Sequence, residues 1–386
     1  MSRYPLSTNT WDDKELEAIQ SVIDSSNYTM GDYVKKFEID FGKFINRKYC
    51  LMVSSGSAAN LISIASFFYT KNPMLKKGDQ VIVPAVSWST TYFPLQQFGL
   101  KLKFVDIDLT TLNYDLDALK SAITSNTKMI VAVNLLGNPN DFDTINDIIK
   151  NKDIFIFEDN CESLGAEYKG KQSGTFGVIG TFSTYFSHHI STMEGGFVTT
   201  DNEEIYHILL SLRAHGWTRN LPKKNHVADK SDDWFEESFR FVLPGYNVRP
   251  TEISGAIGIK QLEKIPLFLK KRRENAKLFI KLFKDHPNYL IQRDIDKSSW
   301  FGFSLIIKPN LKLERKDVIN VLQKNNVECR PIVTGNFVRN DVLKYFDYEI
   351  HKELKNANHL HENGFFVGNS HKCLTKNINF LSEILS

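Results

Sequence analysis

Residues 181–196 carry the sequence TFSTYFSHHISTMEGG. The apolar and β-branched residues from Thr181 to Phe186 predict a short strand. Histidine, serine and threonine side chains follow, and the pair Gly195-Gly196 opens a second apolar run that predicts another strand. Polar groups crowded between two apolar strands are more typical of a functional site than of a protein core.

Upstream of this stretch, apolar runs of strand length alternate with segments that predict helices. The runs are Val81–Pro84, Leu102–Val105, Met129–Val133 and Ile154–Phe157, and the helical segments include Leu116–Ile123 and Phe142–Lys150. Continuous apolar strands separated by helices predict an α/β fold with a mostly parallel sheet that is covered on both faces. Ligands of such sheets bind at the carboxyl ends of the strands.

Two of these strands are followed by candidate ligand-binding residues. Asp159 follows the apolar run IFIF, where a carboxylate is costly unless it meets a cation. That cation is either a protonated pyridine ring or the partner in a structural ion pair. Trp88 follows the strand at Val81–Pro84, and its indole either stacks on a flat heterocycle or packs in the core.

A run of small residues, SSGSAAN at positions 54–60, connects an apolar strand to an apolar helix and contains Gly56 and Ser57. Backbone N–H groups at a helix N-terminus bind phosphate. The run is therefore either a phosphate site or an ordinary capped helix start. Further along, His215 and Arg219 in RAHGWTRN either contact an anionic substrate or lie in a solvated turn.

The carboxyl-terminal third of the chain predicts a second, smaller α+β domain. An amphipathic helix is expected at Thr251–Ile265 and a long basic helix at Leu267–Phe283, and the second of them links the two domains. We place a large domain over residues 1–265 and a small domain over residues 266–386.

Composition excludes several classes of protein. The formal net charge of +3 over 386 residues is too balanced for a nucleic-acid-binding protein. Apolar runs fall short of the roughly 18 residues that a membrane span needs, and the first residues do not form a signal peptide. The four cysteines lie far apart, so we expect no metal site, no iron–sulfur cluster and no disulfide framework. A cytoplasmic protein is predicted.

The spacing within residues 181–196 resembles the active-site loop of the DegT-type sugar aminotransferases, which bind pyridoxal 5'-phosphate (PLP). In that family a lysine that binds the cofactor covalently lies five positions after a serine. An acidic residue follows the lysine by six positions, and two glycines come directly after it. Ser183 and Glu194-Gly195-Gly196 match this pattern, so His188 occupies the lysine position and His189 is its ordinary neighbour. The segments GAEYKG and GTFG, between residues 165 and 177, match the family in the same order.

The resemblance implies an aspartate-aminotransferase-like fold (PLP fold type I) and a homodimer with a shared active site. It also implies roles for individual residues. Asp159 holds the pyridine nitrogen, Glu162 lies near the 3-hydroxyl, and Asn247 reaches the phosphate in the partner subunit. The other expected cofactor contacts are Gly56, Ser57, Trp88 and Ser183, and the expected substrate contacts are His215, Arg219, Arg249 and Arg330.

Within this family, histidine in place of the lysine marks a small group of sugar 3-dehydratases. The resemblance implies that L-glutamate converts non-covalently held PLP to pyridoxamine 5'-phosphate. The C3 hydroxyl of a nucleotide-linked 4-keto-6-deoxyhexose is then removed and ammonia is released. The sequences of the segments STYFSHHISTMEGG, LRAHGWTRN, VLPGYNVRP and ECRPIVTGNF resemble most the enzymes that act on GDP-linked 4-keto-6-deoxy-D-mannose, on the route to colitose. His188 acts as the base and then as the acid, because an imidazole titrates near neutral pH.

Three other functions remain open at this point. An ordinary nucleotide-sugar aminotransferase that tolerates the histidine would produce an aminosugar without ammonia. An iron–sulfur-assisted dehydrase of CDP-sugars would need clustered cysteines, which this sequence lacks. A catalytically inactive, ligand-sensing homologue would turn over no sugar nucleotide, although Asp159, Ser183 and Gly56-Ser57 argue against it because an unused cofactor site need not stay complete.

Overall fold

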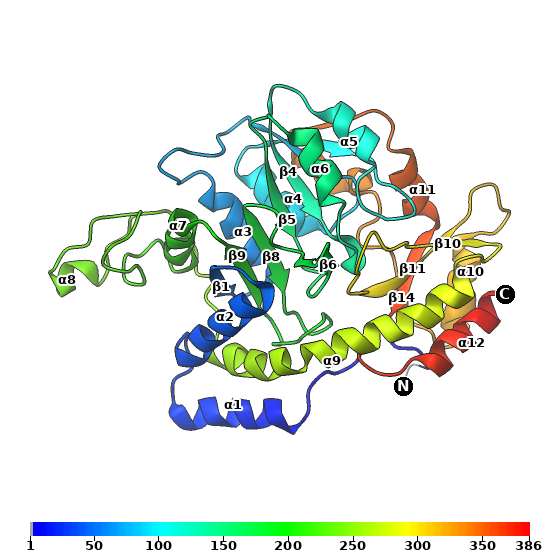
Figure 1. Ribbon diagram of the computed structural model, residues 1–386, viewed down its shortest axis with the longest axis horizontal. Helices are drawn as coiled ribbons and strands as arrows, with labels where there is room; N and C mark the ends of the chain where they lie inside the picture. Colours follow the sequence, from blue (N-terminus) through cyan, green and yellow to red (C-terminus); the bar gives the residue numbers. More distant parts are fainter. Residues whose placement is uncertain (1–2) are drawn as a thin grey trace.

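The computed structural model describes residues 3–386 and shows an α/β protein whose main sheet is mostly parallel, which confirms the predicted fold class (Figure 1). The main sheet contains eight strands in the order β1-β9-β8-β5-β4-β2-β3-β13. β9 runs antiparallel to β1 and β8, and the other neighbouring pairs are parallel. The bounds are Tyr49–Val53 (β1), Gln80–Pro84 (β2), Lys101–Val105 (β3), Thr127–Val133 (β4), Phe155–Asp159 (β5), Ile179–Ser183 (β8), Gly196–Thr200 (β9) and Tyr348–Ile350 (β13).

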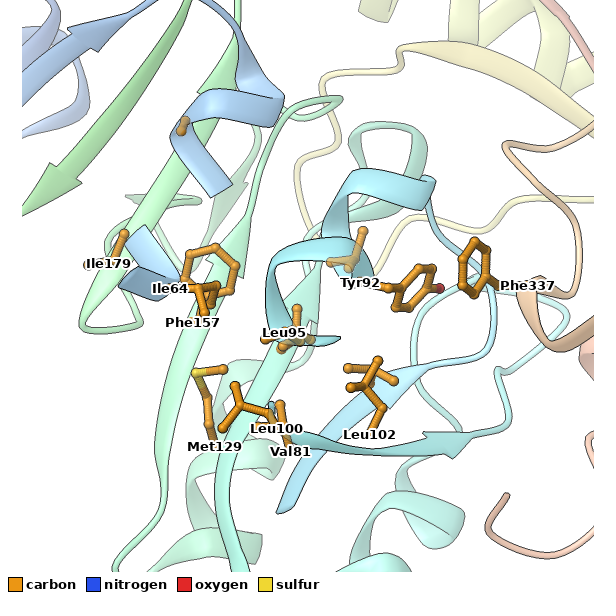
Figure 2. Close-up of a cluster of buried hydrophobic side chains, with 14 of the residues drawn as sticks. Ile64, Val81, Tyr92, Leu95, Leu100, Leu102, Met129, Phe157, Ile179 and Phe337 are labelled. Atoms are coloured by element: carbon orange, nitrogen blue, oxygen red, sulfur yellow. The ribbon is translucent and has the colours of Figure 1, made fainter. Parts of the chain in front are cut away.

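Helices cover both faces of this sheet because successive strand residues point to opposite sides. Val81 and Val83 face one core with α3 and α4, whereas Ile82 faces another with α5 and α6. Figure 2 shows the first of these cores, where Ile64, Tyr92 and Leu95 of the helices lie over strand residues that include Met129 and Phe157. The helices are Gly56–Ser66 (α3), Ser89–Gln97 (α4), Leu116–Ala122 (α5), Phe142–Ile149 (α6) and Glu203–Arg213 (α7).

The strand predicted over Thr181–Phe186 is shorter than expected. β8 ends at Ser183, and Tyr185 and Phe186 are exposed in the turn that follows. The second predicted strand is β9, which starts at Gly196 rather than at Gly195. A Cβ atom on Gly196 would lie 2.5 Å from the carbonyl of Ser55. Glycine is therefore required where β9 passes the N-terminus of α3.

A single long helix, α9 (Glu252–Phe283), connects the main sheet to a small antiparallel sheet (Figure 1). The prediction of two helices that meet near Pro266 was wrong, because Pro266 lies inside this continuous helix. The small sheet has the order β10-β11-β14-β12, and α10, α11 and α12 accompany it. The bounds are Tyr289–Ile291 (β10), Gly302–Ile307 (β11), Cys329–Arg330 (β12), Gly364–Gly368 (β14), Arg315–Lys324 (α10), Lys355–Asn363 (α11) and Thr375–Leu385 (α12).

The division into domains at residues 265 and 266 stays a prediction. That boundary falls within α9, and β13 pairs with β3 of the main sheet although it follows the boundary in sequence. Tyr4, from the other end of the chain, is buried in the core around the small sheet. Both ends of the described chain thus pack against the same part of the molecule.

The remaining elements lie around the main sheet. α1 (Asp13–Ser25) and α2 (Asp32–Ile45) pack on α9, and a two-stranded ribbon is formed by β6 (Glu167–Tyr168) and β7 (Lys171–Gln172). Short 3-10 turns occupy Leu135–Gly137, Phe337–Arg339 and Asp341–Tyr345. The segment that carries α8 (Trp234–Glu237) projects from the body of the molecule, at the left in Figure 1. Among the described residues, no helix combines the length and apolar character that crossing a membrane requires.

Candidate active site

A cavity of about 580 Å³ lies at the carboxyl ends of β2, β4, β5 and β8. Such an edge is where ligands of open α/β sheets bind. The cavity brings together eight of the predicted site residues, from segments far apart in the sequence. They are Gly56, Ser57, Trp88, Asp159, Glu162, Ser183, His188 and Arg330.

The N-terminus of α3 forms one end of the cavity. Ser55 caps the helix, with its Oγ accepting a hydrogen bond from the Ala58 backbone N at 3.0 Å. Ser57 is exposed and donates from its Oγ to Thr90 Oγ1 at 2.8 Å. A Cβ atom on Gly56 would lie 2.7 Å from Ser183 Cβ and 2.8 Å from Cys161 Sγ, so only glycine fits. The unpaired N–H groups of a first helical turn together with hydroxyls suit a phosphate.

Asp159 lies at the end of β5 and is only 5% exposed. Its Oδ2 accepts hydrogen bonds from Asn60 Nδ2 at 2.9 Å and from Thr91 Oγ1 at 2.7 Å, and its Oδ1 accepts one from the Cys161 backbone N at 3.1 Å. Within residues 3–386, no arginine, lysine or histidine forms an ion pair with it. A buried carboxylate surrounded by neutral donors suits a cationic ligand such as a pyridinium ring.

Trp88 is 58% exposed and lines the cavity, directly before α4. This exposure removes the alternative that Trp88 is a core residue. A large aromatic face that stays open at a cavity offers a stacking surface for a flat ring.

Glu162 accepts a hydrogen bond on Oε2 from the Leu136 backbone N at 3.0 Å. The φ angle of Leu136 is 51°, in the left-handed region that residues other than glycine rarely adopt. In this conformation the Leu136 N–H points at the Glu162 carboxyl group. Burial, together with the nearby charge of Asp159, raises the pKa of Glu162 to about 7. A group that titrates near neutral pH holds or releases a proton at little cost.

His188 follows β8 and lines the cavity, whereas the neighbouring His189 is only 1% exposed and has its Nε2 3.2 Å from the Ser299 carbonyl. The His188 ring packs edge-on against Tyr185 and Phe301, with centroids 5.8 and 5.2 Å away. Its Nδ1 is enclosed without a hydrogen-bond partner. Burial and the positive charge of Arg272 lower the pKa of His188 to about 4, so the ring is neutral at physiological pH. Lysine is absent from the described residues that line the cavity.

Four predicted site residues lie outside this cavity, in a separate cluster near α8. Arg219 and Arg249 stack over Trp217, with their guanidinium carbons 4.6 and 5.7 Å from the ring centroid. Arg249 Nε donates to Asn247 Oδ1 at 3.0 Å, and the His215 ring centroid lies 4.8 Å from that of Trp217. The nearby aromatic side chains are strongly exposed: Trp234 78%, Phe235 74%, Phe239 67% and Phe241 55%.

Sequence reasoning missed several residues at the site. Asn60 and Thr91 contact Asp159, and Asn60 is the one amide at the start of an otherwise apolar helix, which was the available signal. Leu6 and Phe366 line the cavity from the two ends of the chain, and no pattern in the sequence marks them. Glu158 was also missed. Its buried carboxylate accepts hydrogen bonds from the backbone N–H groups of Gly174, Phe176 and Gly177, and these bonds hold the GTFG segment against β5.

No cluster of three or more His, Cys, Asp or Glu side chains in the described part of the chain is arranged to hold a metal ion. Cys50, Cys161, Cys329 and Cys373 are all free thiols.

Comparison with known proteins agrees with this geometry. The model of the DegT/DnrJ/EryC1/StrS aminotransferase family matches residues 9–381. GDP-4-keto-6-deoxy-D-mannose 3-dehydratase of Escherichia coli O55:H7 is 61% identical over 387 residues, which cover 100% of both chains.

Two crystal structures match with a TM-score of 0.99 each, at 61% identity and 100% coverage of both chains. One is the GDP-4-keto-6-deoxymannose-3-dehydratase (ColD) H188N mutant with bound GDP-perosamine, and the other is GDP-4-keto-6-deoxymannose-3-dehydratase with a trapped PLP-glutamate geminal diamine. The aminotransferase-like fold is thereby confirmed. This chain belongs to the DegT/DnrJ/EryC1/StrS aminotransferase family.

Proposed function

We infer that this protein is a PLP-dependent 3-dehydratase that removes the C3 hydroxyl of GDP-4-keto-6-deoxy-D-mannose, with L-glutamate as the amino donor. The observation that carries this function is an imidazole, His188, at the cavity in the position where the family has its lysine. The protein that is 61% identical over the whole chain has the same activity in its name, and its crystal structures hold PLP–glutamate and GDP-perosamine.

The residues of the cavity fit PLP. The N-terminus of α3 with Ser57 would hold the phosphate, Asp159 would hold the ring nitrogen, and Trp88 would cover one ring face. Glu162 and Ser183 would lie towards the 3-hydroxyl and the phosphate side of the ring. When bound, the cofactor supplies an electron sink for the bond that breaks in the substrate.

His188 moves the proton. Its ring is neutral above pH of about 4, and Nδ1 is enclosed, so Nε2 is the nitrogen that accepts a proton from the reacting carbon. The pKa of about 4, rather than the near-neutral value expected from the sequence, makes the neutral ring a weaker base than an ordinary imidazole. It also makes the protonated ring a readier proton donor, which favours release of the same proton to the departing C3 hydroxyl. The edge-on contacts with Tyr185 and Phe301 hold the His188 ring in one orientation.

The imidazole also decides between dehydration and transamination. A lysine at position 188 would hold the cofactor covalently and return a proton to the sugar carbon, which completes transfer of the amino group. An imidazole forms no such covalent link, so the sugar–cofactor adduct is left to lose its hydroxyl and then to be hydrolysed. Ammonia and a 3-deoxy ketosugar are the expected products.

We propose that the active form is a homodimer in which each chain completes the site of the other. Arg219, Asn247 and Arg249 lie outside the cavity of their own chain, and Arg219 donates to the carbonyl of Ser238, directly after α8, at 3.0 Å. The exposed Trp234, Phe235, Phe239 and Phe241 form an apolar surface of the kind that a partner covers. The four free thiols agree with a cytoplasmic location.

The activity is tested by incubating the purified protein with PLP, L-glutamate and GDP-4-keto-6-deoxymannose. Release of ammonia and a sugar product that has lost one oxygen are expected. An aminosugar without ammonia would show an aminotransferase, and no PLP-dependent turnover would show an inactive homologue.

The shared site is tested by mixing two inactive variants, His188→Asn and Arg219→Ala. Mixed dimers contain one intact site, so activity should return on subunit exchange. Failure of the mixture to recover activity would contradict the shared site.

A further inference from the structure

Asp159 is held by two side chains for which the sequence suggested no role. Asn60, in the first turns of α3, and Thr91, in the first turn of α4, both donate to the same oxygen, Oδ2, at 2.9 and 2.7 Å. Both are 1% exposed, so water does not compete for these bonds. The two helices thus hold the carboxylate inside the cavity, which Asn60 and Thr91 line together with Asp159.

The donor role of each residue is fixed by its other partner. Thr181 Oγ1 donates to Asn60 Oδ1 at 2.6 Å, which leaves the Asn60 amide nitrogen facing Asp159. Thr91 Oγ1 lies 2.9 Å from Ser87 Oγ. Because a carboxylate only accepts, the Thr91 hydroxyl hydrogen must point at Asp159, and Ser87 then donates to Thr91.

These contacts leave one position of the carboxylate open. An ionised carboxylate has about four lone-pair sites. Two on Oδ2 are taken by Asn60 and Thr91, and one on Oδ1 is taken by the Cys161 backbone N at 3.1 Å. The remaining site is on Oδ1, and Asp159 lines the cavity. All three donors are neutral groups, so a cation suits the open site.

We propose that Asn60 and Thr91 are positioning residues that keep the Asp159 carboxylate turned so that Oδ1 meets the protonated ring nitrogen of the cofactor. This rests on the proposed binding of PLP at the cavity. These contacts extend to the segment after β12, because the Thr334 hydroxyl donates to the Ser87 carbonyl at 2.7 Å. Thr334 lies in the same segment as Arg330, which lines the cavity.

The test is Thr91→Val, which keeps the shape of the side chain and removes the hydroxyl. We expect PLP affinity, measured by equilibrium titration without substrate, to fall about tenfold, as for a lost hydrogen bond to a charged group. The nuclear magnetic resonance shift of nitrogen-15-labelled PLP should move towards the unprotonated pyridine. Thr91→Ser, which restores a hydroxyl, should restore both. Asn60→Leu gives a second variant should Thr91→Val fold poorly.

A carbocyclic analogue of PLP, in which carbon replaces the ring nitrogen, separates positioning from general damage. Its affinity should be the same in the wild type and in Thr91→Val, because it makes no bond to Asp159. Thr199→Val is the matched control, since Thr199 is equally buried but bonds only to the carbonyls of Gly174 and Gly180.

Two results would overturn the proposal. One is wild-type PLP affinity and wild-type nitrogen shift in both Thr91→Val and Asn60→Leu. The other is an equal loss of PLP and of the carbocyclic analogue, which would make the residues merely structural. If the wild-type protein itself bound no PLP, the proposed function would fail first, and this outcome is distinguishable because it needs no variant.

Discussion

Replacing Gly196 with alanine should damage the phosphate end of the cavity without removing any polar group. The added Cβ would lie 2.5 Å from both the carbonyl carbon and oxygen of Ser55 and 2.6 Å from the Gly56 backbone N. Non-bonded carbon atoms normally approach to about 3.5–4.0 Å, so β9 and the N-terminus of α3 must separate by about 1 Å. The obstructing atoms are backbone and cannot rotate aside.

The magnitude follows from this displacement. Overpacking of this kind destabilises a protein by about 1–3 kcal/mol, which is measured as the free energy of unfolding in urea. A misplacement of about 1 Å at a catalytic site lowers the rate by about 100-fold. We therefore expect Gly196→Ala to bind PLP weakly, because the N–H groups of α3 no longer converge on the phosphate.

Gly42→Ala is the matched control. Gly42 lies within α2, and a Cβ there would be 3.3 Å from the Arg47 carbonyl oxygen and 3.4 Å from Cys50 Cβ. Alanine favours a helix by up to about 1 kcal/mol over glycine, so stability should change little. If Gly196→Ala kept wild-type PLP affinity in spite of reduced stability, the contact between β9 and α3 would not set the phosphate site.

Three further predictions concern the titratable groups. His188→Asn should abolish release of ammonia while PLP still binds; if His188→Asn were active and His189→Asn were not, the alignment would be wrong by one residue. The pKa of His188 is about 4 in the folded protein, below its ordinary value of 6.5. Because the unfolded chain therefore binds a proton at this histidine before the folded protein does, the free energy of unfolding is highest above pH of about 6.5 and falls as the pH drops towards 4. The shift corresponds to at most ~3 kcal/mol, and the unfolding free energy of His188→Asn should fall less steeply over that range. Equal slopes would refute a half-buried ring that is neutral in the folded protein. Glu162→Gln keeps an acceptor for the Leu136 N–H but removes a carboxyl group whose pKa is about 7. Any change in the absorption of bound PLP around pH 7 should therefore disappear in this variant. If the absorption change persisted, a group other than Glu162 would be responsible for it.

Local patterns were sufficient for much of the fold. Apolar runs located β2, β3, β4 and β5 to within two residues at each end, since a parallel strand buried on both faces needs an unbroken apolar run. The aromatic Trp88 and the acidic Asp159, which follow two of these runs, were expected at a ligand site because parallel strands end at a common edge, and both line the cavity. The continuous helix α9 was split in the prediction, because proline usually ends a helix but is tolerated here at Pro266.

The sequence by itself determined the resemblance that puts His188 in the lysine position of the family, because Ser183 and Glu194-Gly195-Gly196 match the family spacing along one continuous loop. Only the tertiary structure decided which side chains support Asp159, because Asn60 and Thr91 come from two different helices that meet over the sheet. It also separated Arg219 and Arg249 from the cavity that the same chain provides. Spacing along a chain specifies local register, whereas contacts between segments depend on how helices and strands pack in three dimensions.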